Sequence, residues 1–257
     1  MDAHRALVET WNACHARLNQ SAVFRKMAAG TLTRREYAAI LRQIFHHARE
    51  NPQLQALATA RFRGEQRGLV KMFCKHAIAE VGHDQLALND LAALGEDVGE
   101  IPFERPLPAT FALLASAFHM IEHHNPVAYV GYLFHLEYTP VQVGARSMDA
   151  LAACGIPREA MGFLAEHAHA DVAHCRLLRH YADQLVRTEA DLADVLYMQR
   201  ITAEGYERML EQAVETADAW DELSPPSNAE LRQRRPAAAN PLAVANPHAA
   251  SCGDQRG

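Results

Sequence analysis

The sequence predicts an all-α bundle of about seven helices that ends in a disordered tail. Three observations carry this prediction. No run of alternating β-branched residues and no Asn-Gly or Asp-Gly turn indicates a β-hairpin. Helix start and stop signals recur along the first 223 residues. After Leu223 the chain holds five Pro and eight Ala and few large apolar residues. We therefore expect a helical domain over 1–223 and a disordered tail over 224–257.

The positions of the helices are predicted from residues that typically start and end helices. Thr33-x-x-Glu36 is a capping box, and Thr188 is followed by acidic residues that suit a first helical turn. Asn125-Pro126 and Gly155-Ile156-Pro157 mark further starts. Pro52 predicts a kink in the third helix. The expected spans are residues 3–19, 21–29, 34–60, 65–94, 108–123, 126–153, 157–186 and 189–220.

Composition excludes several classes of protein. The chain has 257 residues, 49% of them hydrophobic, and a formal net charge of −6, so it lacks the basic surplus of a nucleic-acid binder. Five scattered cysteines form no Cys-x-x-Cys motif. Residues 123–145 carry a single charge, Glu137, but hold enough polar residues to suggest a central bundle helix and not a membrane span. We expect a cytoplasmic, reduced protein without membrane or nucleic-acid partners.

Two predicted helices carry carboxylates and histidines at close spacing. Glu80-x-x-His83 lies in the predicted helix 65–94, where both side chains would share one face within one turn. His167, Asp171 and His174 lie at i, i+4 and i+7, offsets of about +40° and −20° around the axis. Asp171-x-x-His174 repeats the carboxylate-x-x-His pattern.

A single carboxylate precedes each pair. Glu50 lies 30 residues before Glu80, and Glu137 lies 34 residues before Asp171. Two lone carboxylates and two carboxylate-x-x-His pairs match the logic of a di-iron or di-manganese site in a helical bundle. Oxygen and nitrogen donors without thiolate favour iron or manganese over structural zinc.

Each residue also has a plainer interpretation. Glu80-x-x-His83 alone is more often a solvated pair, and the 167–174 stripe could be an exposed polar surface. Glu137, set in an apolar run, could instead pair with a buried Arg or Lys. Glu50 shares its face with His46 and His47, so any of the three could be the ligand or lie at the surface. His76, one turn before Glu80, could support the site or be an ordinary buried histidine.

These motifs resemble the haem-oxygenase-like di-iron oxidases, also described as iron-containing redox enzymes, which share a fold with TenA and PqqC proteins. The resemblance covers about residues 1–220. It rests on His76-Ala-Ile-Ala-Glu80-Val-Gly-His83, on Phe134-His-Leu-Glu137-Tyr-Thr-Pro140 and on His167-x-x-x-Asp171-x-x-His174. It implies a seven-helix haem-oxygenase-like bundle. Glu50 matches the family's first ligand by spacing only.

The resemblance also implies an activity. Family members bind two Fe(II) ions, with Mn as an alternative, and activate dioxygen for N-oxygenation, desaturation or oxidative C–C cleavage of a small amino- or fatty-acid-like substrate. The implied metal ligands are Glu50, Glu80, His83, Glu137, His167, Asp171 and His174. Glu137 and Asp171 would also act in catalysis. An external electron donor and a homodimer are compatible with this assignment.

Three other functions stay open on the sequence alone. The chain could be a metal-free enzyme of the TenA or PqqC kind, with a buried Glu137 and a Cys as catalytic groups. It could be a ferritin-like iron-binding protein without turnover, or an interaction module with incidental histidines. For the interaction module, the discriminating observation would be that the chain takes up no metal.

Overall fold

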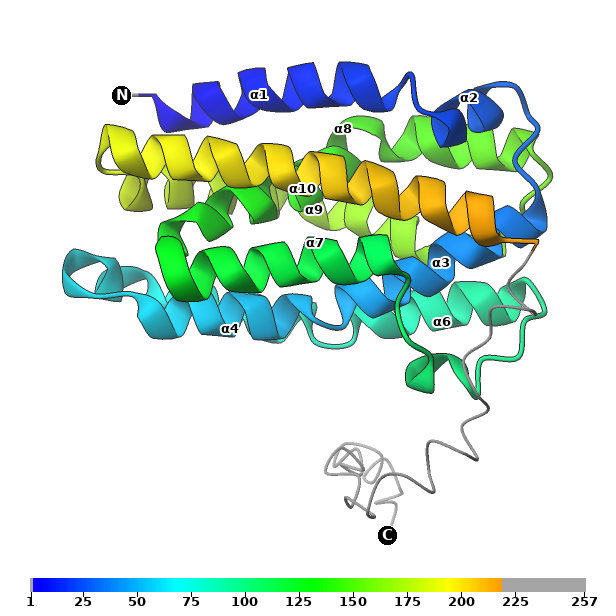
Figure 1. Ribbon diagram of the computed structural model, residues 1–257, viewed down its shortest axis with the longest axis horizontal. Helices are drawn as coiled ribbons and strands as arrows, with labels where there is room; N and C mark the ends of the chain where they lie inside the picture. The colour runs from blue at the N-terminus through cyan, green and yellow to red at the C-terminus, as the bar shows by residue number, and fades with distance from the viewer. Residues whose placement is uncertain (1, 219–257) are drawn as a thin grey trace, which may run out of the picture. The chain divides into compact units, whose positions relative to one another are not determined.

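The computed structural model describes residues 2–218, apart from the side chains of residues 169–174, and this part of the chain is helical without strands (Figure 1). The all-α prediction is confirmed. The described helices are α1 (Ala3–Leu18), α2 (Ala22–Ala28), α3 (Arg34–Ala48), α4 (Asn51–Arg61), α5 (Val70–Glu80), α6 (His83–Ala93), α7 (Pro108–His119), α8 (Tyr129–Ala153), α9 (Gly162–Leu185) and α10 (Glu189–Thr216). The predicted tail, 224–257, lies outside the described residues.

Two predicted long helices are each divided in two. The predicted helix 34–60 ends at Ala48 and restarts at Asn51, with Pro52 in the first turn of α4. The predicted helix 65–94 breaks between Glu80 and His83, where Val81 is extended and Gly82 has φ +98°. That backbone conformation suits glycine because it has no Cβ. The interruption expected at Pro52 is a complete break and not a kink, whereas the break between Glu80 and His83 was not expected and alters the site.

The capping signals read from the sequence are confirmed. The Thr33 backbone N–H donates to the Glu36 carboxylate at 2.8 Å, and the Glu36 N–H donates to the Thr33 hydroxyl at 3.2 Å. Thr188 and Asp191 form the same reciprocal pair at the start of α10. Each box satisfies backbone donors that the first helical turn leaves without partners.

The last described helix, α10, runs through the middle of the bundle and packs against α1, α3, α7 and α8 (Figure 1). Gly131 allows α8 to approach it closely, because a Cβ at this position would lie 2.0 Å from the Val195 carbonyl oxygen. On its other side α8 packs against α9, and α9 also contacts α6. Helices that carry candidate metal ligands and are far apart in sequence therefore meet in the interior of the bundle.

The apolar run that approaches membrane length forms a short 3₁₀ turn, Pro126–Ala128, followed by the first part of α8. Its residues from Val127 to His135 are buried in the bundle. Among the described helices, none combines the length and the apolar character needed to cross a bilayer. The run is a core helix, and Glu137 lies on it.

Candidate metal centre

Glu80 is the last residue of α5 and lies at the centre of the site. The buried residues of α5 are Phe73, His76, Ala77 and Glu80, which repeat at i, i+3, i+4 and i+7 and so form one helix face. The opposite face, with Ile78 72% exposed, points to solvent. The amphipathic pattern of this helix therefore carries a carboxylate, only 4% exposed, into the bundle.

The first group of metal-type donors consists of His76, Glu80 and Glu137, all buried. The His76 Nε2 lies 3.7 Å from Glu80 Oε1 and 3.6 Å from Glu137 Oε1. One donor atom from each of the three residues lies within 4.8 Å of the others. α5 supplies two of these residues and α8 the third, so helix packing assembles the group.

The second group consists of Glu80, His83 and His167, again with donor atoms within 4.8 Å of one another. His83 Nδ1 lies 3.3 Å from Glu80 Oε2, and the adjacent carboxylate raises the pKa of His83. His167 Nδ1 donates to the Phe163 carbonyl at 2.7 Å. That bond fixes the tautomer and leaves the Nε2 lone pair of His167 available as a ligand, which is how metal-binding histidines are commonly oriented.

Glu80 belongs to both groups and presents a different oxygen to each. Oε1 faces His76, and Oε2 faces His83. Oε1 is buried and accepts no hydrogen bond within the described part of the chain. A buried carboxylate oxygen without a donor is costly, and a cation satisfies it. Two groups that share one carboxylate offer places for two cations bridged by it, and these donors suit iron or manganese.

The structure brings together four of the seven predicted ligands. Glu80, His83, Glu137 and His167 lie in the two groups. The expectation that Glu80 and His83 share one helix face was wrong, because the break at Val81-Gly82 places them on α5 and α6. They still meet, since the left-handed glycine redirects the chain only two residues after Glu80. The side chains of Asp171 and His174 lie outside the described residues.

Glu50 lies between α3 and α4. It precedes α4 at the break after α3, and its carboxylate lies 3.5 Å from the Arg49 guanidinium. Neither donor group found among the described residues includes it. Its role as a ligand stays a prediction from sequence spacing.

His76 is the donor that the sequence left undecided. The structure places it against both Glu80 and Glu137. The available signal was the i, i+4 spacing of His76 and Glu80, which puts both on one helix face. That spacing alone could not distinguish a donor from an ordinary buried histidine.

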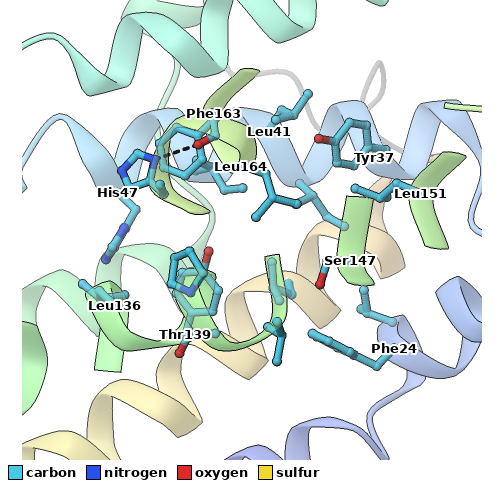
Figure 2. Close-up of a pocket in the computed structure, with 18 of the residues that line it drawn as sticks. Phe24, Tyr37, Leu41, His47, Leu136, Thr139, Ser147, Leu151, Phe163 and Leu164 are labelled. Carbon is cyan, nitrogen blue, oxygen red and sulfur yellow. Dashed lines mark hydrogen bonds between the residues drawn. The ribbon is translucent and has the colours of Figure 1, made fainter. Parts of the chain in front are cut away.

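A cavity of about 160 Å³ adjoins the donors. Glu80, Glu137 and His167 belong to its wall, while most of the remaining wall is aliphatic or aromatic. Figure 2 shows His47, Leu136 and Thr139 on one side of the cavity, and Phe24, Tyr37, Ser147 and Leu151 on the other. The donors therefore open onto a space large enough for a small molecule.

Three polar side chains in and beside this wall form a hydrogen-bonded network. The Tyr132 hydroxyl donates to Asn51 Oδ1 at 2.8 Å and lies 2.9 Å from His47 Nε2, which can donate to it as a neutral imidazole. Burial lowers the pKa of His47 to about 4, so the ring is uncharged at neutral pH. The network adds polarity beside the donors without adding charge.

Comparisons with known proteins identify the family and the fold. The model of a family described as iron-containing redox enzymes matches residues 38–207. A Shewanella denitrificans domain of unknown function with a heme oxygenase-like fold superposes with a TM-score of 0.72 at 23% identity, covering 84% of this chain and 92% of that one. A TenA homolog from Pseudomonas syringae pv. tomato superposes with a TM-score of 0.69 at 14% identity, covering 82% and 92%. No curated protein matches. The two structures establish a haem-oxygenase-like fold, as expected from the sequence.

Proposed function

Because this chain belongs to the iron-containing redox enzyme family, we propose that it is a non-haem di-iron oxidase. It would use dioxygen to oxidise a small organic substrate by N-oxygenation, desaturation or oxidative C–C cleavage. Two Fe(II) ions per chain are the proposed cofactor, with Mn(II) as a substitute.

The observation that carries the proposal is the position of Glu80 in two donor groups. A single mononuclear site would need only one of them. The burial of Glu80 and Glu137, at 4% and 5% exposure, adds the charge argument, because two nearby buried carboxylates repel and bound cations would relieve that repulsion. Asp171 and His174, proposed from the sequence, would add one donor of each kind from α9.

When bound, the iron pair would supply the electrons that reduce dioxygen, and an external donor would restore them where the substrate does not. The chain's own groups prepare the site. Glu80 and Glu137 would hold the cations and neutralise their charge, and we propose that Glu137 and Asp171 also take part in catalysis. His83 and His167 fix the ligand geometry, and we add His76 to this set. The apolar wall excludes water, which limits loss of oxidant to solvent.

A metal-free enzyme is the second candidate, since the TenA homolog shares the fold. That candidate requires a nucleophile near Glu137. Among the described residues that line the cavity there is no cysteine. Without a cation, Oε1 of Glu80 also stays buried and accepts no hydrogen bond within the described part of the chain. The di-iron proposal explains both observations.

Anaerobic reconstitution tests the proposal. The purified chain is loaded with Fe(II), bound iron is counted, and oxygen is then added with candidate substrates while absorbance is followed. We expect two irons per chain and oxygen consumption that depends on them. Iron binding that is unaffected by Glu137→Ala would contradict the proposed site. Two bound irons without oxygen consumption under any substrate condition would instead support an iron-binding protein without turnover.

A further inference from the structure

Three histidines lie together at the surface, where α7 ends and the chain turns toward α8. We call this cluster the histidine turn; it consists of His119, His123 and His124, all of them exposed. The Nε2 atoms of His119 and His124 lie 3.2 Å apart, and the centroid of the His119 ring lies 4.9 Å from that of His123. Neither the donor groups nor the cavity wall found among the described residues includes any of the three.

A π-helical turn brings His119 and His124 together. In an α-helix, side chains five residues apart point about 140° away from each other around the axis. Residues Met120–His124 instead form a π-helix, after which the Asn125 N–H donates to the Met120 carbonyl, five residues back, at 3.0 Å. This wider turn places positions five residues apart on one side of the helix. Such turns are rare and are found frequently at functional sites.

The backbone of the histidine turn is held by neighbouring helices. The Asn125 side chain donates to Asp191 Oδ1 at 3.1 Å and to Asp194 Oδ2 at 2.9 Å, which ties the end of the turn to α10. The Arg61 guanidinium, on α4, donates to the Glu122 carbonyl within the turn. The backbone that carries the histidines is therefore fixed before any ligand binds, which lowers the entropic cost of binding.

The distance between the two Nε2 atoms suits a single metal ion. Zinc–nitrogen bonds of about 2.0–2.1 Å, at an angle of about 90° to 109°, place two ligand atoms about 2.8–3.4 Å apart. The separation of 3.2 Å between His119 and His124 lies within this range. A hydrogen bond between two neutral imidazoles has a similar length, and a metal ion would replace it once both rings carry their proton on Nδ1.

His123 supplies a third imidazole beside this pair. Its Nε2 lies 4.0 Å from the Glu122 carboxylate, and its side chain is 60% exposed, so the ring is free to turn toward His119 and His124. Imidazole ligands suit zinc, nickel and copper, and nickel and copper bind such sites more tightly than iron does. The carboxylate-containing donor groups of the interior suit iron or manganese instead.

We propose that the histidine turn is a second metal site, which binds one Zn(II), Ni(II) or Cu(II) ion at the surface. His119 and His124 chelate the ion through Nε2, and His123 turns to provide the third nitrogen. The bound ion links the last turn of α7 to the segment that leads into α8. This site is separate from the candidate metal centre and does not depend on the proposed function.

Retention of the untagged protein on immobilised Ni(II) tests the histidine turn alone, because a resin cannot reach the buried donors. We expect the wild type to bind and to elute only with added imidazole. His119→Gln and His124→Gln should each elute nearly as early as the double variant, since the chelate is lost with either ligand. His180→Gln, at an exposed histidine of α9, is the matched control and should elute like the wild type. Equal elution of the wild type and the double variant would overturn the proposal.

Calorimetric titration with Zn(II) measures the number of ions and their affinity. The wild type should bind one more ion per chain than the double variant His119→Gln/His124→Gln. Because the second imidazole binds within the same molecule, either single variant should weaken binding of this ion about 10-fold or more. His123→Gln should also weaken it, and unchanged affinity in that variant would overturn the assignment of a third ligand.

Urea unfolding without metal checks that the variants fold. The three histidines are exposed, so their replacement should leave the free energy of unfolding of the metal-free protein nearly unchanged. Added Zn(II) should then stabilise the wild type more than it stabilises the double variant. Equal stabilisation of the two proteins by Zn(II) would contradict a metal site at the turn.

Iron uptake distinguishes this inference from the proposed function. The double variant should still take up two Fe(II) ions per chain under anaerobic conditions. If the chain takes up no iron but the histidine turn binds zinc, the proposed function fails and the surface site stands. If iron is bound and the double variant binds as much zinc as the wild type, only the surface site fails.

Discussion

The two ends of the cavity differ in what stabilises them. At the donor end, three histidines and two carboxylates lie together in a largely buried interior. At the other end, whose wall includes Val23, Phe24, Leu41, Val143 and Leu151, aliphatic and aromatic residues surround space that no side chain fills. A cation would satisfy the donors at the first end, whereas the second end offers mainly apolar contacts. One face of α8 contributes to both, since it carries Glu137 to the donors and Val143 and Leu151 to the apolar end.

The largest effect is expected at the residue that both donor groups share. Glu80→Gln removes the charge that would hold two cations while nearly preserving the shape of the side chain. Since loss of even a supporting group around a metal typically weakens binding 10–100-fold, we expect affinity for both irons to fall by about 100-fold or more. Iron content after anaerobic loading and desalting measures this effect.

The control for this variant is Glu166→Gln, an exposed carboxylate on α9 next to His167. It should retain two irons. Equal iron content in Glu80→Gln and the wild type would remove the basis for a shared ligand.

The second expected effect concerns stabilisation by the metal. Glu137 and Glu80 have carboxylate oxygens within 4.8 Å of each other in a buried site. Cations bound there would relieve the repulsion between them, so added Mn(II) should raise the free energy of unfolding of the wild type by about 1–3 kcal/mol, and by less in Glu137→Gln. Urea unfolding with and without Mn(II) measures both increases. An equal increase in the two proteins would contradict the charge argument.

The third expected effect is a difference in destabilisation between a leucine in the apolar wall of the cavity and a leucine in the packed core. Leu41 lines the cavity, whereas Leu54 lies fully buried outside it. Leu54→Ala should cost about 3–5 kcal/mol, and Leu41→Ala at least about 1 kcal/mol less, because Leu41 already borders empty space and has fewer contacts to lose. Urea unfolding of the two variants compares them. Equal losses in the free energy of unfolding would indicate that the cavity beside Leu41 is closed in solution.

Most of the fold could be predicted from the sequence because its signals are local. The reciprocal caps at Thr33 and Thr188 act within one helical turn, and they are where the sequence placed them. The break at Gly82 was missed because a single glycine within a helical pattern is tolerated about as often as it marks a turn. Its left-handed conformation depends on how α5 and α6 pack.

Only part of the candidate site could be predicted from the sequence, because some of its contacts depend on how the helices pack. Glu80, His83, Glu137 and His167 could be recognised by type and spacing. The proximity of His76 to Glu137, 3.6 Å between Nε2 and Oε1, depends on how the bundle places α5 relative to α8, and spacing within one helix carries no information on it. The ligand role of Glu50, inferred from spacing alone, stays a prediction.

The smallest expected effect is on the pH dependence of stability. Burial lowers the pKa of His47 to about 4, below the value of about 6.5 expected in the unfolded chain. The unfolded state therefore binds a proton between pH 6.5 and 4 that the folded state does not. The contribution of His47 to the free energy of unfolding is therefore greatest above pH 6.5. Below that pH the free energy of unfolding falls by up to about 1.4 kcal/mol per pH unit because of this residue.

Urea unfolding of metal-free wild type and His47→Gln between pH 7.5 and 4.5 checks this dependence. The variant should lose stability less steeply with falling pH. Identical slopes would show that His47 accepts its proton in the folded state.

The central claim is that Glu80 joins two metal sites. Crystals grown anaerobically with Fe(II), measured on both sides of the iron absorption edge, test it most directly. We expect two anomalous peaks, one beside Oε1 of Glu80 near His76 and Glu137, and one beside Oε2 near His83 and His167. A single peak, or peaks away from Glu80, would contradict this account.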